Sequence, residues 1–144
     1  MLVSQMEFTD LEEKVSKLGR SVLNCLASDF GKAYVVAITR DGCPACEKQK
    51  PELNGLAETV LKKHRGKVIF IRLHVKQPSG DVTESLRAKD MFGHYFYPTN
   101  MIVIRTRDRG AVELYRNASP EMDELERNIE SALETAIMME KESN

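Results

Sequence analysis

Residues 33–51, Ala-Tyr-Val-Val-Ala-Ile-Thr-Arg-Asp-Gly-Cys-Pro-Ala-Cys-Glu-Lys-Gln-Lys-Pro, decide the fold of this chain. Their first part, 33–39, is a continuous apolar and β-branched run, which is typical of a strand buried on both faces. A short turn then leads to Cys43 and Cys46, which open a helical pattern. A second apolar run follows at 67–75. Strand, helix and strand in this order need a crossover connection, so we predict that the two strands pair in parallel.

Further elements are expected on both sides of this unit. Over 8–28, apolar residues recur every three or four positions, which predicts an amphipathic N-terminal helix. The pattern over 1–7 is weak and is compatible with a short edge strand. Downstream we expect a helix at 84–92 with Leu86 on its buried side, an antiparallel pair of strands at 100–106 and 111–115, and a last helix opened by Ser119 and Pro120. The sequence therefore predicts one α/β domain over 1–144, with a mixed sheet of four to five strands flanked by helices.

Composition excludes several classes of protein. The chain has 144 residues, of which 42% are hydrophobic and 30% charged, and this is ordinary globular composition. Its net charge of −1 gives no electrostatic footprint for nucleic acid or for an anionic membrane. No apolar run reaches the length of a membrane helix, and residues 1–10 do not resemble a signal peptide. We therefore expect a cytoplasmic protein, in which disulfides are transient.

The two cysteines at 43 and 46 form the candidate site. The first turn of a helix has unpaired N–H groups and the positive end of the helix dipole, so a thiolate at Cys43 is stabilised and its pKa should fall below that of a free thiol. Pro44 suits the first turn, where its missing N–H costs nothing. Cys46 lies one turn further in and should be less exposed. This geometry predicts that Cys43 attacks a substrate disulfide and Cys46 resolves the mixed disulfide.

A cysteine pair at this spacing also occurs in metal, haem and purely structural sites. A zinc site needs two more ligands, but Cys25 and the three histidines (His64, His74 and His94) have no ligand spacing. Covalent haem attachment needs a histidine directly after the second cysteine, where Glu47 stands. A structurally inert pair stays open. Cys25 itself is expected to be a small buried hydrophobic residue.

Three features together resemble the thioredoxin superfamily. They are the Cys43-Pro-Ala-Cys46 motif, Pro51 eight residues after the first cysteine, and Tyr97-Pro98-Thr99 just before a strand. The resemblance implies a thioredoxin-like fold, a cis peptide bond before Pro98, and a Tyr97 backbone that pairs with an extended substrate segment. It also implies that Pro98 keeps metal from bridging the two thiols. The substrate contacts implied in this way are Gly42, Pro44, Ala45, Tyr97, Pro98 and Thr99.

The chain departs from thioredoxin itself at several positions. It has no Trp, and Gly42 precedes the first cysteine. Ala37 stands where thioredoxin has a buried aspartate that helps to deprotonate the resolving thiol, so the proton must go to water or to another group. Arg72 stands where the family often has lysine, and either an exposed position or a role in the site is compatible with the sequence. Because of these departures, the sequence does not decide whether the protein reduces the disulfides of its substrates or acts as an oxidant or isomerase.

The sequence therefore predicts a thiol-disulfide oxidoreductase that exchanges electrons through Cys43 and Cys46. We expect it to act on protein disulfides, to be reduced by an upstream reductase or dithiol donor, to be a monomer, and to need no metal and no cofactor beyond its own disulfide. A binding or adaptor module of the same fold with little redox activity is the alternative. An iron–sulfur dimer of glutaredoxin type is a third and weaker possibility.

Overall fold

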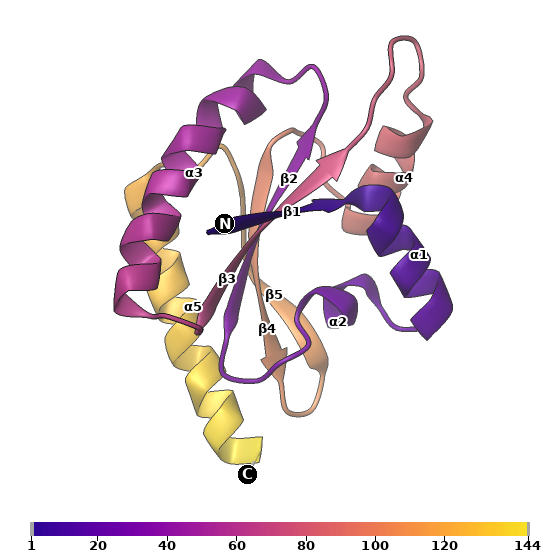
Figure 1. The fold of residues 1–144 in the computed structure, drawn as a ribbon. Coiled ribbons are helices and arrows are strands. Elements are labelled where there is room, and N and C mark those ends of the chain that lie inside the picture. The colour runs from indigo at the N-terminus through magenta and orange to yellow at the C-terminus, as the bar shows by residue number, and fades with distance from the viewer. Residues whose placement is uncertain (1, 144) are drawn as a thin grey trace.

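A five-stranded sheet runs through the centre of the molecule, and helices cover both of its faces (Figure 1). The computed structural model describes residues 2–143, so Met1 and Asn144, which the single-domain prediction includes, lie outside the described residues. The strand order is β1-β3-β2-β4-β5. The strands are β1 (Val3–Glu7), β2 (Ala33–Arg40), β3 (Val68–Val75), β4 (Thr99–Thr106) and β5 (Gly110–Ala118).

The predicted mixed sheet is confirmed. Strands β1, β3 and β2 are parallel, whereas β4 pairs antiparallel with both β2 and β5. The weak pattern at the N-terminus does form a strand, β1, which extends the sheet beyond β3. The central strand β2 is buried along almost its whole length, as its apolar run predicts.

Helices are divided between the two faces of the sheet. One face is covered by α1 (Phe8–Leu18), α2 (Val22–Leu26) and α4 (Thr83–Phe92), and the other by α3 (Pro44–Lys63) and α5 (Met122–Ser143) (Figure 1). Because side chains alternate along a strand, Val36 of β2 packs in the first core and Ala37 in the second. The sheet thus separates two apolar cores.

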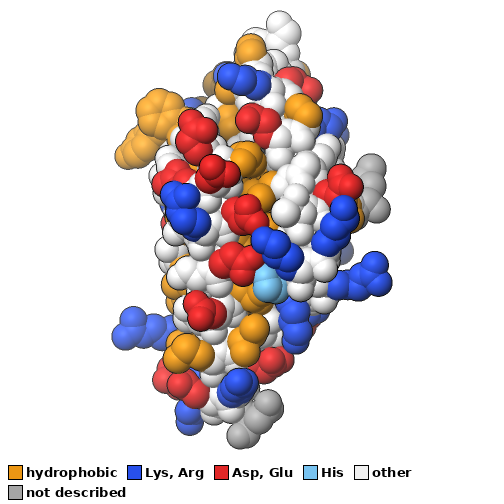
Figure 2. All heavy atoms as spheres, turned by 90° about the vertical axis from the view of Figure 1, so that its left-hand side faces the viewer, with side chains coloured by type: hydrophobic (Ala, Val, Ile, Leu, Met, Phe, Trp, Pro, Cys, Tyr) orange, Lys and Arg blue, Asp and Glu red, His pale blue; other side chains and the backbone are white. Residues whose placement is uncertain are grey.

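Charges of both signs cover the outer face made by α3 and α5. Figure 2 shows acidic and basic side chains interleaved there, without a patch of one sign. An ion pair between Lys63 and Glu126 at 3.2 Å and a hydrogen bond between His64 and Glu130 at 2.9 Å join α5 to the end of α3. On this face, Lys and Arg side chains do not form a continuous basic surface of the kind that binds the phosphate backbone of a nucleic acid.

The N-terminal helix predicted over 8–28 is wrong in extent, because the segment is broken into two helices. Gly19 ends α1 in the left-handed conformation with φ 62°, and its N–H donates to the carbonyl of Val15. Ser21 then caps α2 by accepting the N–H of Asn24. The apolar spacing continues across the break, so periodicity alone does not reveal it.

Two further local predictions are wrong. Ser119 does not open the last helix, because its φ of 54° lies outside the helical region and α5 begins at Met122. Leu86 is not buried: it is 58% exposed, whereas Ser85 and Ala88 of α4 face the core. A short helix with few large apolar residues gives a weak signal for its buried side.

Candidate active site

Both cysteines lie at the first turn of α3, immediately beyond the carboxyl end of β2. Cys43 is the N-cap, Pro44 is the first helical residue, and the two sulfurs form a disulfide. The backbone N–H of Cys46 donates to Sγ of Cys43 at 3.1 Å. This donor is one of the unpaired N–H groups that a helix start provides, and it will stabilise a thiolate at Cys43.

The two cysteines differ little in exposure. Cys43 is 5% exposed and Cys46 is 2% exposed, so Cys46 is the less exposed of the two, as the sequence predicts, by a small margin. The surroundings of Cys43 are open, since Gly42, Pro44 and Ala45 are all exposed. Their contact with a substrate stays a prediction.

The loop before β4 lies against the disulfide. The Tyr97–Pro98 peptide bond is cis, and the carbonyl oxygen of Tyr97 lies 3.6 Å from Sγ of Cys43. Pro98 and Thr99 are buried, and the Thr99 hydroxyl donates to the carbonyl of Phe96 at 2.7 Å. The structure therefore brings together the two motifs that the sequence analysis singled out.

The ring of Tyr97 is held by groups from three elements. Its hydroxyl lies 3.0 Å from Oγ of Ser85 in α4, and the Arg40 guanidinium stacks over the ring at 5.5 Å. His94 meets the ring edge-on with centroids 4.7 Å apart. Burial raises the pKa of Tyr97, so the phenol stays protonated and can donate. These contacts fix the loop that presents its carbonyl to Cys43.

His94 is a buried, neutral histidine. Burial, with the nearby charges of Lys89 and Arg116, lowers its pKa to about 4. Neither ring nitrogen has a hydrogen-bond partner among the described residues. His94 therefore acts as an aromatic packing residue behind Tyr97 at neutral pH.

A row of polar residues crosses the sheet beneath the start of α3. In the pairing register Ala37 lies between Arg72 and Asn100, and all three are buried. Gln49, one turn after Cys46 on the buried side of α3, is also buried. The amides of Gln49 and Asn100 and one nitrogen of Arg72 lack partners among the described residues. Polar atoms buried in this way are usually satisfied by ordered water.

Arg72 is therefore buried rather than exposed, and its role in the site stays a prediction. Burial lowers its pKa, and the charge of Glu47, the neighbour of Cys46, opposes that shift. A guanidinium keeps its proton nonetheless. The place where thioredoxin has a buried acid is thus occupied by Ala37, with a buried cation beside it in the next strand.

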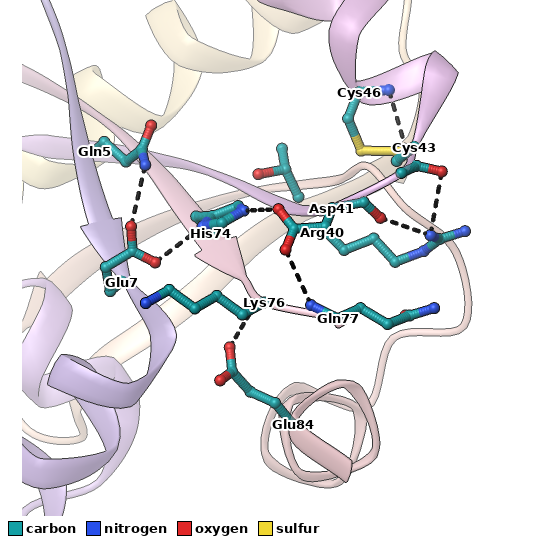
Figure 3. Close-up of polar contacts among 12 residues, drawn as sticks. Gln5, Glu7, Arg40, Asp41, Cys43, Cys46, His74, Lys76, Gln77 and Glu84 are labelled. Carbon is teal, nitrogen blue, oxygen red and sulfur yellow. Dashed lines mark hydrogen bonds and ion pairs between the residues drawn. A yellow bond between two sulfur atoms is a disulfide. The ribbon is translucent and has the colours of Figure 1, made fainter. Parts of the chain in front are cut away.

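A charged network that the sequence does not reveal lies beside residues 41 and 42, the segment that joins β2 to Cys43 (Figure 3). His74, near the end of β3, lies between Glu7 of β1 and Asp41, which comes two residues before Cys43. No local signal could have revealed it, because the three residues meet only through the register of β1, β3 and β2.

Two structural properties of the described residues concern other functions. Within residues 2–143, no group of three or more His, Cys, Asp or Glu side chains is placed to hold a metal ion. No helix in the same range is long and apolar enough to cross a membrane.

Comparison with solved structures identifies the architecture. A thioredoxin from Trichomonas vaginalis superposes with a TM-score of 0.62 at 17% identity, covering 91% of this chain and 97% of the other. The chain has a thioredoxin fold. A thioredoxin from Nicotiana alata (TM-score 0.56, 20% identity, 90% of each chain) and thioredoxin f from spinach chloroplast in its short form (0.56, 18%, 90% of this chain and 92% of the other) have the same thioredoxin fold. No protein-family profile and no curated protein matches the sequence.

Proposed function

We propose that this protein is a thiol-disulfide oxidoreductase that acts on protein disulfides. The observation that carries the proposal is the Cys43–Cys46 pair at the start of α3, with the Tyr97 carbonyl 3.6 Å from Sγ of Cys43. A reactive dithiol next to a backbone carbonyl can bind an extended peptide and exchange disulfides with it.

The reaction proceeds in two exchanges. The thiolate of Cys43 attacks one sulfur of the substrate disulfide, forms a mixed disulfide, and releases the other substrate sulfur as a thiolate that takes a proton from water. Cys46 then gives its proton to water and attacks Sγ of Cys43, which releases the second substrate sulfur as a thiolate. Two electrons pass to the substrate, and the protein leaves as the Cys43–Cys46 disulfide.

The expected partners follow from this chemistry. Substrates are protein disulfides in extended segments that lie along the Tyr97 backbone, and an upstream reductase or dithiol donor restores the two thiols. The site residues themselves carry both exchanges, so the proposal includes no metal and no cofactor. We expect a monomer that works in a reducing compartment such as the cytoplasm.

The test is reduction of insulin disulfides by the full chain with dithiothreitol as donor. Cys43→Ser should abolish the activity, and Cys46→Ser should trap a mixed disulfide that gel electrophoresis detects. Cys25→Ser is the matched control, because Cys25 is a buried free thiol and the change should leave the rate unaltered. Equal activity in the Cys43→Ser variant and the parent would refute the proposal.

An adaptor module remains the second candidate, favoured by the low exposure of both sulfurs. It predicts partner binding that survives replacement of both cysteines. The equilibrium redox potential separates the two candidates. A reversible couple below about −230 mV supports a reductant, and a clearly higher one supports an oxidant or isomerase. If no intramolecular disulfide forms at any redox potential of the buffer, the adaptor module describes the protein better than the oxidoreductase does.

A further inference from the structure

His74 is bonded on both sides by carboxylates. Its Nδ1 lies 2.9 Å from Oε2 of Glu7, and its Nε2 lies 2.7 Å from Oδ1 of Asp41. Carboxylate oxygens only accept hydrogen bonds, and a neutral imidazole has one N–H, so both contacts are satisfied only by the imidazolium. The His74 side chain is 21% exposed, which shields the pair of contacts in part from water.

This arrangement ties the loop before Cys43 to the edge of the sheet. The Asp41 carboxylate also accepts the backbone N–H of Gln77 at 3.2 Å, and the Asp41 N–H donates to the carbonyl of Val75. Arg40 donates from Nη1 to the carbonyls of Asp41 at 2.9 Å and Gly42 at 3.4 Å. Figure 3 shows the loop held between β1, β3 and the cysteine turn by these contacts.

The charges around His74 come from four segments. Glu7 on β1 and Asp41 on the loop bond it directly, and Lys76 after β3 acts on both of these carboxylates. Glu84 of α4 accepts the backbone N–H of Lys76 (Figure 3). Burial alone would lower the pKa of His74, but the two carboxylates outweigh it and raise that pKa, which favours the imidazolium near neutral pH.

We propose that His74 is a positioning residue for Cys43, and that the proton it holds between Glu7 and Asp41 makes the reactivity of Cys43 depend on pH. The inference rests on the proposed function. With the proton in place, the loop is fixed and the charge of Asp41 is balanced. Without it, Asp41 faces Glu7 with no cation between them, two residues before Cys43. That uncompensated negative charge disfavours the Cys43 thiolate.

The experiment measures the rate of alkylation of Cys43 by iodoacetamide between pH 5.5 and pH 9, in the full chain with Cys46→Ser. His74→Leu should lower the rate at pH 7 about threefold to tenfold, the change produced by a rise of half to one unit in a thiol pKa. His74→Lys keeps a cation at every pH in this range, so it should restore the rate. The step in the rate that follows titration of His74 should be absent in both variants.

His64→Gln is the matched control. His64 also bonds a carboxylate, Glu130 at 2.9 Å, but it lies at the far end of α3 from Cys43. The control should leave the alkylation profile unchanged. A second comparison separates charge from structure: adding Asp41→Asn to His74→Leu removes the unbalanced charge and should raise the rate again, although it also removes hydrogen bonds.

Several results would overturn the inference. They are an alkylation profile in His74→Leu equal to that of the parent, a double variant no faster than His74→Leu, or an NMR titration that finds the His74 ring neutral at pH 6. The titration uses the unaltered protein, so it decides the matter even if His74→Leu does not fold. Alkylation needs no substrate disulfide. Failure to reduce insulin with the pH step intact would therefore reject the proposed function alone.

Discussion

The carbonyl oxygen of Tyr97 lies 3.6 Å from Sγ of Cys43, although the two residues are 54 positions apart in the sequence. The contact joins the loop before β4 to the start of α3. Its position depends on the Tyr97 ring, which is held by Ser85 of α4, Arg40 of β2 and His94 of the same loop. Cys43 is thus placed by its own helix, and the carbonyl beside it by a packed aromatic side chain.

Loss of the Tyr97 ring should therefore weaken the site. Tyr97→Phe removes the hydrogen bond to Ser85 and should cost about 1 kcal/mol of unfolding free energy. Tyr97→Ala should cost about 2–4 kcal/mol and should also lower the rate of insulin reduction. The control is Tyr95→Ala, because Tyr95 is 84% exposed and its loss should leave stability unchanged. Urea unfolding and the insulin assay measure both effects. Equal losses at the two tyrosines would argue against a specific role for the packed ring.

His94 should make the fold sensitive to acid. Its pKa in the folded state is about 4, below the ordinary value of 6.5, so the unfolded chain takes up this proton first. Stability is therefore complete above pH 6.5 and falls as the pH drops from 6.5 to 4, by about 3 kcal/mol in total. His94→Leu should remove most of this slope. Urea midpoints at pH 5 and pH 7 test the prediction, and an unchanged slope would assign the proton uptake to another group.

Arg72 should favour redox chemistry at the expense of stability. Its buried nitrogen lacks a partner among the described residues, so Arg72→Met should leave the free energy of unfolding unchanged or raise it by about 1 kcal/mol. Loss of the cation should raise the pKa of the Cys46 thiol. Alkylation of Cys46 against pH in the Cys43→Ser background measures the second effect. Arg65→Met, at an exposed arginine, is the control. A stability loss above about 2 kcal/mol would indicate that the guanidinium has a strong partner.

Cys25 should not react with alkylating reagents in the native protein. It is a free cysteine in α2 that packs in the core against the sheet. Its exposed fraction of 5% equals that of Cys43 and exceeds the 2% of Cys46, so the expected difference in reactivity rests on the start of α3, which stabilises a thiolate at Cys43 and Cys46. After reduction, a mass-shifting alkylator should modify Cys43 and Cys46 under native conditions and reach Cys25 only in urea. Native labelling of all three cysteines would show that α2 opens readily and would make Cys25 a candidate for modification.

The sequence was most informative where its signals are local. The β-branched run at 33–39, the cysteine pair and the apolar run at 67–75 each define one element, and their order defines a parallel crossover that the structure confirms. Gly19 and Ser21 were missed because the apolar spacing carries on through the break between α1 and α2. The capping residues Gly19 and Ser21 mark the end of one helix and the start of the next, but the regular apolar spacing across them favours one continuous helix.

The polar surroundings of the cysteines could not be predicted in the same way. His74 meets Glu7 and Asp41 only because β1 adds to the edge of β3 in one particular register. Arg72 and Asn100 become neighbours of Ala37 through pairings of β2 with β3 and with β4. Such groupings depend on which strands are adjacent and which residues are opposite one another, and a single sequence shows neither.

The short spacing of the disulfide has a thermodynamic consequence. Cys43 and Cys46 are three positions apart, within one helical turn, so the bond closes a very small loop. In the chain-entropy description, a cross-link of this span restricts the unfolded ensemble far less than one that spans a whole domain, by about 2 kcal/mol against nearly 5. Neither cysteine belongs to either apolar core or to any of the five strands. We therefore expect the same fold in both oxidation states of the cysteine pair.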